Sequence, residues 1–191
     1  MSNAPRQCLR AALMFFVFLS GAASAASPCA AGTEPDMELR VVAAGIAPDA
    51  DRTTVVRVYA DGCAQVHRPA YRRDAGEFRV DLDKAALAAL RTSVDRSALR
   101  SFDAKRLGAE LAASQKNADG VTQRYIEADA DRYEIRWLNA GKRASVAWDG
   151  VPAYAEQFPD NSTLQQMLGA VKALQALADR ADAGRIEGGT P

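Results

Sequence analysis

His67 is the single histidine of this 191-residue chain, and it limits every chemistry that depends on an imidazole base. A serine hydrolase needs such a base beside an activated serine, yet the chain contains no Gly-x-Ser-x-Gly turn. The residue lies in Val66-His67-Arg68-Pro69, at the end of a predicted strand. We interpret it as a polar strand-end residue, with ligand binding as the alternative hypothesis.

Loops that hold phosphate or calcium are missing from the sequence. Gly141-Lys142 matches the end of a Walker loop, but Arg136 occupies the position of its first glycine. Asn117-x-Asp119-Gly120 matches part of an EF-hand, yet the closing position holds Ile126 instead of glutamate. The sequence therefore predicts no cofactor and no metal.

Carboxylates are plentiful, with 24 aspartates and glutamates in the chain. Two of them facing each other in a pocket could hydrolyse a glycosidic bond. Their spacing in the sequence singles out no pair, because any two acids can meet in a fold. A small hydrolase that uses Asp or Glu residues is therefore kept as an alternative function.

Two segments combine charged or aromatic side chains with loop signals, and loops carry binding function more often than strands do. The first runs from His67 to Arg73, and the second runs from Trp148 to Phe158. The alternatives are a solvated loop for the first and packing under the last helix for the second. The candidate binding residues are His67, Arg68, Tyr71, Arg72, Arg73, Trp148 and Tyr154.

The first 25 residues have the pattern of a secretory signal peptide. Arg6 and Arg10 precede an apolar run of about nine residues, and small residues follow it at 22–26. A membrane-spanning helix needs about 20 apolar residues, so this run is too short. We expect cleavage after Ala25. A membrane anchor that is retained is the alternative.

The cysteines fit this destination. Cys8 would leave with the signal peptide, and Cys29 and Cys63 would remain in an oxidising compartment. We therefore predict a disulfide bond between them, with two free thiols as the alternative. Two cysteines and one histidine are too few ligands for a structural zinc site.

Alternating apolar and polar residues predict the strands, and turn residues separate them. Asp61-Gly62 and Asn139-Ala140-Gly141 are hairpin signals. The predicted strands cover residues 37–42, 53–60, 63–68, 77–82, 121–128, 132–138 and 143–148.

Helical spacing replaces this alternation in three places, at 83–94, at 102–114 and at 162–181. The last is the clearest, since Ser162 and Gln165 form a capping-box pattern before a long apolar stripe. Runs of antiparallel strands followed by helices predict an α+β fold. We expect an antiparallel sheet of hairpins packed against two or three helices, including a long C-terminal amphipathic helix.

The expected organisation is a signal peptide at 1–25, a flexible leader at 26–36, a single domain at 37–183 and a disordered tail at 184–191.

The 24 basic and 24 acidic residues balance, and such a chain lacks the basic excess of a nucleic-acid binder. The chain that remains after cleavage has no further long apolar stretch, so we expect no membrane insertion. We expect a periplasmic or secreted bacterial protein, and the sequence indicates no catalytic constellation. The hypothesis is a non-enzymatic module that binds a protein or a cell-envelope component, with a secreted enzyme inhibitor as a further alternative.

Overall fold

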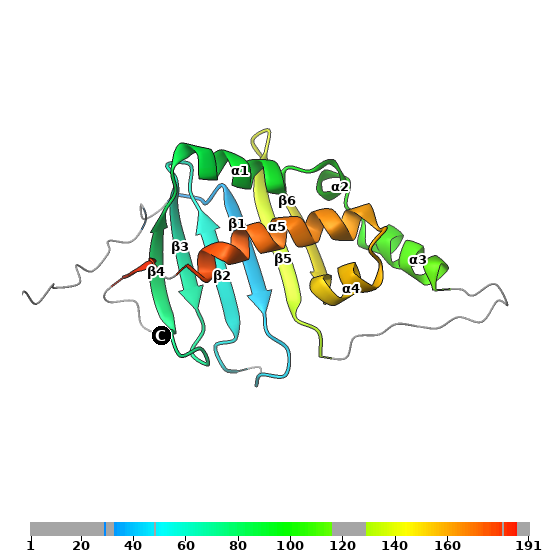
Figure 1. The fold of residues 1–191 in the computed structure, drawn as a ribbon, viewed down its shortest axis with the longest axis horizontal. Helices are drawn as coiled ribbons and strands as arrows, with labels where there is room; N and C mark the ends of the chain where they lie inside the picture. The colour runs from blue at the N-terminus through cyan, green and yellow to red at the C-terminus, as the bar shows by residue number, and fades with distance from the viewer. Residues whose placement is uncertain (1–28, 30–32, 48, 116–128, 181, 187–191) are drawn as a thin grey trace, which may run out of the picture.

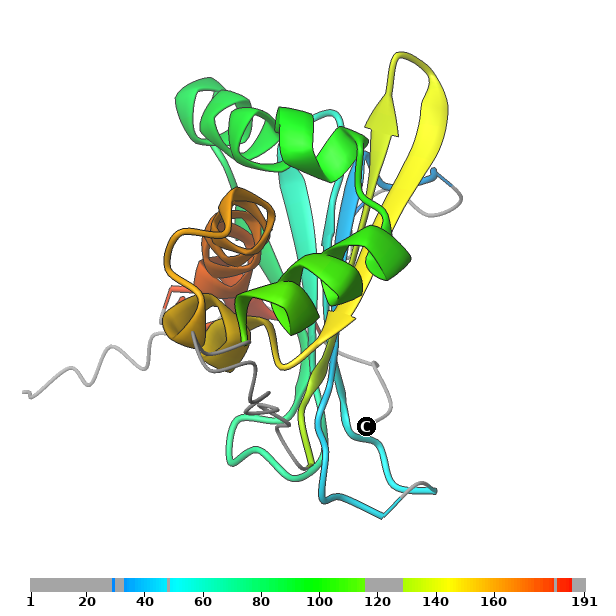
Figure 2. The same cartoon turned by 90° about the vertical axis from the view of Figure 1, so that its right-hand side faces the viewer.

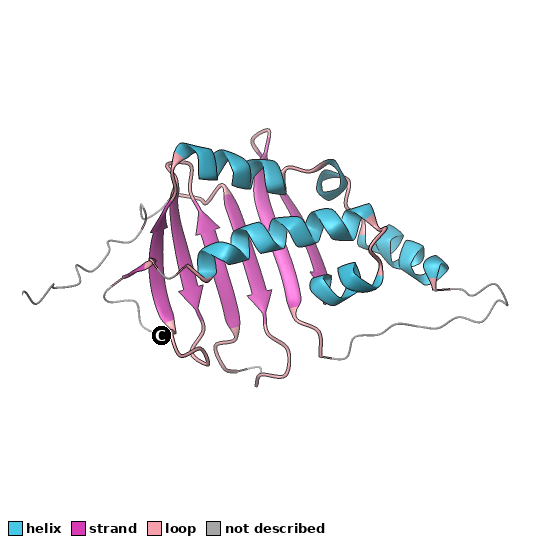
Figure 3. Cartoon of the chain, in the orientation of Figure 1, coloured by secondary structure: helices cyan, strands magenta, loops and turns pink. Residues whose placement is uncertain are grey.

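The computed structural model describes residues 29, 33–47, 49–115, 129–180 and 182–186. Within these residues one antiparallel sheet is covered by helices on one side, which confirms the predicted α+β class (Figures 1 and 3). The predicted signal peptide and the predicted strand at 121–128 lie outside the described residues. The strands are β1 (Met37–Val42), β2 (Thr53–Val58), β3 (Cys63–Arg68), β4 (Gly76–Asp81), β5 (Arg132–Asn139), β6 (Lys142–Asp149) and β7 (Gly184–Arg185).

The sheet has the order β6-β5-β1-β2-β3-β4-β7. Strands β1 to β4 form a meander, and the hairpin of β5 and β6 adds to the free side of β1. This brings Glu134 directly opposite Arg40, although 93 other residues separate them in the chain. The hairpin turn at Ala140 and Gly141 uses positive φ angles of 47° and 77°, as a two-residue turn of this kind requires.

The helices are α1 (Lys84–Val94), α2 (Ser97–Arg100), α3 (Ala104–Ser114), α4 (Val151–Gln157) and α5 (Ser162–Ala178). Helix α1 begins where Asp83 accepts a hydrogen bond from the Ala86 amide. Helix α5 begins one residue earlier than the capping-box pattern predicts, because Asn161 accepts from the Leu164 amide. Gln165 donates instead to the carbonyl of Ala155 in α4, so it ties the two helices together.

Helix α4 lies in the segment that the sequence analysis treats as a loop. Pro152 stands in its first turn, where the missing amide hydrogen breaks no helical hydrogen bond. Gly150 precedes it with a φ of 65°, a left-handed conformation that glycine adopts without strain. The proline thus starts a helix here, whereas we had expected it to mark a loop.

The C-terminal end also differs from the expectation. Gly184–Arg185 form the short strand β7, which pairs with β4 where we expect a disordered tail. Ile186 donates its amide to the carbonyl of Glu77, and its side chain is buried. An apolar side chain that fits beside the edge strand explains the difference for these three residues.

The core lies between the sheet and the helices, with α5 crossing the strands (Figure 1). Its sheet side comes from alternate strand residues, which are Met37, Leu39, Val41, Val56, Val58, Ala64, Val66, Phe78, Val80, Tyr133, Ile135, Trp137 and Val146. Cys29 and Cys63 form the predicted disulfide bond, with their Cα atoms 5.9 Å apart. Among the described residues, no helix is both long and apolar enough to cross a bilayer.

Candidate functional site

The side of the sheet away from the helices is a charged surface. Figure 2 shows α1, α4 and α5 on one side of the strands and α3 crossing in front of the edge strand β6, and alternate strand residues point to the side away from α5. Residues that are paired across neighbouring strands share a face, which identifies the set from the register. We call the charged and polar members of this set the charged face: Glu38, Arg40, Thr53, Arg57, Gln65, His67, Glu77, Arg79, Asp81, Arg132, Glu134, Arg136, Arg143, Ser145 and Asp149. The apolar residues Val42, Val55, Leu138 and Ala147 lie among them.

Glu38 on β1 organises the middle of the charged face. Its carboxylate lies 3.0 Å from Nε of Arg57 on β2 and 3.6 Å from Nη1 of Arg136 on β5. Arg136 also donates from Nε to Glu134 at 2.9 Å, and this hydrogen bond raises the pKa of its guanidinium above the ordinary value. Glu38 is only 9% exposed, so these two arginines compensate a nearly buried charge.

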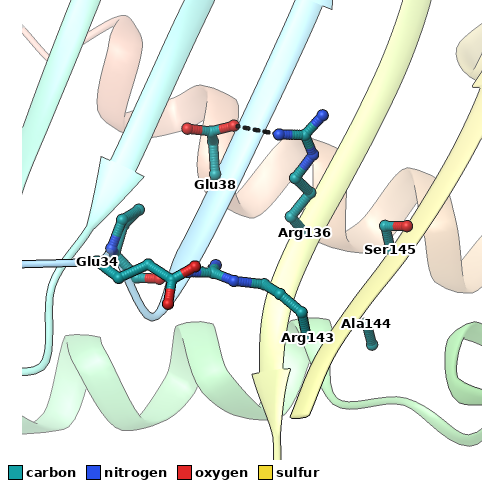
Figure 4. Close-up of a pocket in the computed structure, with 7 residues that line it drawn as sticks. Glu34, Glu38, Arg136, Arg143, Ala144 and Ser145 are labelled. Carbon is teal, nitrogen blue, oxygen red and sulfur yellow. Dashed lines mark hydrogen bonds and ion pairs between the residues drawn. The ribbon is translucent and has the colours of Figure 1, made fainter.

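A pocket of about 370 Å³ opens on the charged face between the strands and the segment before β1 (Figure 4). Arg143 at the start of β6 reaches across it, where it pairs with Glu34 and donates to the carbonyl of Pro35 at 2.9 Å. The pocket walls therefore carry both signs of charge. The lining residues are Glu34, Pro35, Glu38, Arg136, Arg143, Ala144 and Ser145.

Arg40 occupies the next position along β1 on the charged face and is half-buried. Opposite it stand Glu134 on β5 and Val55 on β2. Glu134 is hydrogen-bonded to Arg136, and Val55 offers no acceptor. Within the described part of the chain, no hydrogen bond or ion pair reaches the Arg40 guanidinium.

Arg68 was a binding candidate from sequence, and the structure places it inside the molecule at 6% exposure. It donates from Nε to the carbonyl of Ala178, from Nη2 to the carbonyl of Arg180, and from Nη1 to Asp74. Its guanidinium also lies 4.0 Å from the centre of the Phe78 ring. Arg68 thus caps the C-terminal end of α5 and holds it against β3.

Arg72 strengthens the same attachment from the loop. It donates to Asp74 at 3.0 Å and to Asp179, just beyond α5, at 3.3 Å. The hydrogen bond from Arg72 lowers the pKa of Asp74, and the nearby charge of Arg68 adds to the effect. Tyr71 and Arg73 remain exposed in this loop, Tyr71 at 51%.

His67 lies on the charged face with a carboxylate on each ring nitrogen. Nδ1 is 2.7 Å from Glu77, and Nε2 is 3.0 Å from Asp51. Asp51 also accepts from the Ala70 amide, and Glu77 accepts from Gln65. The histidine therefore joins the loop before β2 to β3 and β4.

Trp148 and Tyr154 pack against α3 and α5. The two rings meet edge to face with centres 6.0 Å apart, and Phe158 stacks on Tyr154 at 6.2 Å. They border a second apolar cluster built on Leu107, Leu111, Ala155 and Leu164. This placement matches the packing alternative of the sequence analysis.

The structure does not bring the seven sequence candidates together in one site. Sequence reasoning missed the pocket residues Glu34, Glu38, Arg136 and Arg143, and it missed Arg40 beside them on β1. The signal that could have found them is the charge alternation within the predicted strands at 37–42 and 132–138. That alternation identifies a polar face of each strand, but it does not show which strands pair and so which side chains become neighbours across the sheet.

The described residues contain no group of three or more histidine, cysteine, aspartate or glutamate side chains that could hold a metal ion. Comparison of the chain with protein-family models, with curated protein sequences and with solved structures gave no match.

Proposed function

We propose that this protein is an exported, non-enzymatic binding module that contacts a protein partner through the charged face. The observation that carries the proposal is the sheet itself, which is covered by helices on one side and presents ordered rows of charged side chains on the other. Ion pairs hold these side chains in place before any partner arrives, so binding loses little side-chain entropy.

The pocket favours binding over carboxylate catalysis. A glycosidase of the two-carboxylate type keeps one acid protonated, usually in apolar surroundings. Both acids of this pocket stand beside arginines instead, Glu34 with Arg143 and Glu38 with Arg136. Fixed charges of both signs suit the recognition of polar groups on a partner.

The size of the charged face suggests a weak or transient complex. Six strands of six to eight residues, at about 4.8 Å between strands and 3.3 Å per residue, give a plane of roughly 500 Å². Stable interfaces bury about 600–1,000 Å² on each partner. Even with the pocket wall added, the charged face lies toward the lower end of that range.

Export to the periplasm or beyond the cell is part of the proposal. It is supported by the signal-peptide pattern of the first 25 residues and by the Cys29–Cys63 bond, since disulfide bonds persist in oxidising compartments.

Site-specific photocrosslinking tests the proposal. A benzoylphenylalanine is placed at Ser145 on the charged face and, as the matched control, at Ala89 on the exposed side of α1. Both positions are exposed, so both variants should fold. After irradiation of intact cells, we expect a discrete adduct from Ser145 that is absent from Ala89, and mass spectrometry identifies it as a protein.

Adducts of equal yield from both positions, or none from Ser145, would overturn the proposal. The identity of the crosslinked partner also distinguishes a binding module from the remaining alternative, a secreted enzyme inhibitor. If it is an enzyme that the purified protein inhibits, the module is an inhibitor.

A further inference from the structure

Arg40 differs from the other arginines in the middle of the charged face. Its diagonal neighbours are Arg57 on β2 and Arg132 and Arg136 on β5, which places four guanidinium groups around one spot. Three of the four have carboxylate partners, because Arg57 and Arg136 bind Glu38 and Arg132 binds Asp149 at 3.0 Å. Among the described residues, Arg40 has none.

The local charge is therefore unbalanced by one. Four arginines face three carboxylates, which are Glu38, Glu134 and Asp149. A half-buried guanidinium carries five N–H donors in a planar fork that fits a carboxylate. An acidic group that arrived from outside would use these donors and neutralise the excess charge.

We propose that Arg40 is the anchor of the charged face and binds the carboxylate of an acidic side chain on the protein partner. This inference rests on the proposed function and adds the chemistry of the contact. Arginines that are surrounded by other interface groups are frequent hot spots of binding energy.

A protein fits this surface better than a polyanion does. A nucleic acid or an anionic membrane presents many negative charges at once, and these would meet Glu38, Glu134 and Asp149 around the anchor. The balanced charge of the chain also provides no long-range attraction to a polyanion. Arg40, which has no ion-pair partner in the part of the chain that the structure describes, matches one acidic side chain.

Nuclear magnetic resonance of the arginine Nε–H groups in the folded, oxidised protein tests the inference. The probe is a blocked five-residue peptide with one glutamate between serines and glycines, and the control peptide carries glutamine in its place. We expect the Arg40 signal to shift saturably with the glutamate peptide only. Arg73, which is exposed and distant in the loop after β3, is the control arginine and should not shift.

The variants Arg40→Gln and Arg40→Lys measure the effect on the partner itself. We expect Arg40→Gln to reduce the Ser145 crosslink roughly tenfold and Arg40→Lys to restore part of it, since lysine keeps the charge but lacks the fork. Unchanged thermal unfolding would show that both variants fold.

Three outcomes would overturn the inference. Arg73 shifting as much as Arg40 would indicate non-specific attraction. Inorganic phosphate or phosphatidylglycerol vesicles saturating the Arg40 signal more tightly than the peptide would assign the site to phosphate groups. Full crosslinking by Arg40→Gln would leave the proposed function intact but remove Arg40 from it. Absence of a crosslink from position 145 when Arg40 is unchanged would instead contradict the proposed function itself.

Discussion

Strand β5 presents two different surfaces to the two sides of the sheet. Tyr133, Ile135 and Trp137 lie under the helices and are buried, whereas Glu134 and Arg136 lie on the charged face. The same strand therefore contributes to the core and to the charged face with no residue shared between them. This separation means that the two sides can be tested independently by substitutions one residue apart.

The largest effect is expected from Ile135→Ala, since this side chain is fully buried at 0% exposure. Removing its branched end should lower the free energy of unfolding by about 3 kcal/mol, from lost burial and the cavity left behind. Glu134→Ala, the adjacent residue on the charged face, should change it by less than about 1 kcal/mol. Urea unfolding of both variants measures the difference, and equal losses would contradict the separation of the two sides.

The arginines offer the same comparison at smaller scale. Arg68→Ala removes three hydrogen bonds and leaves the carbonyls of Ala178 and Arg180 without the Arg68 donors, whereas Asp74 keeps Arg72, so we expect a loss of about 2 kcal/mol. Arg40→Gln should cost less than about 0.5 kcal/mol, because no described residue depends on Arg40. Thermal unfolding of the two proteins checks this. A larger loss for Arg40→Gln would mean that Arg40 serves the fold and not a partner.

The smallest effect concerns the pH dependence of the α5 attachment. The pKa of Asp74 is lowered from its ordinary value of 3.8, chiefly by the hydrogen bond from Arg72. A carboxyl group with a lowered pKa stabilises the fold above its ordinary value, and this contribution is lost as pH falls through the folded value. Asp74→Asn should therefore be less stable than the parent at neutral pH, by less than about 1 kcal/mol because the pair is exposed.

Unfolding curves at pH 7 and at pH 3 measure this difference. It should shrink at the lower pH, because pH 3 lies below the ordinary value of 3.8 and the carboxyl group of the unfolded chain is then largely protonated. A difference that grew toward pH 3 would contradict the assigned direction.

The spacing of apolar and polar residues along the sequence was sufficient to predict the fold class and most helices and strands. Strands β1 and β3 were predicted with the bounds that the structure has, because alternation and turn residues are local signals. Helix α4 was missed because a proline permits a first turn as well as a loop. Strand β7 was missed because two residues carry no period.

The candidate site was harder to predict, since it depends on which strands lie together. Arg40 and Glu134 become neighbours only through the pairing of β1 with β5, and no local pattern specifies that pairing. The loop arginines show the opposite problem. Arg68 lies in a segment rich in charged and aromatic residues, which is typical of binding loops. Its guanidinium is buried nevertheless, because it donates to backbone carbonyls at the end of α5.

The bond between Cys29 and Cys63 has a consequence for when the pocket is complete. The bond attaches the segment before β1 to β3 at Cys29, and β1 holds the same segment where it enters the sheet. Glu34 and Pro35 lie between these two attachments and form one wall of the pocket. A chain with both thiols reduced keeps the strand residues of the pocket but lacks one of the two attachments of that wall. Treatment with a reductant such as dithiothreitol is therefore expected to loosen the wall that contains Glu34 and Pro35 while the strands stay paired.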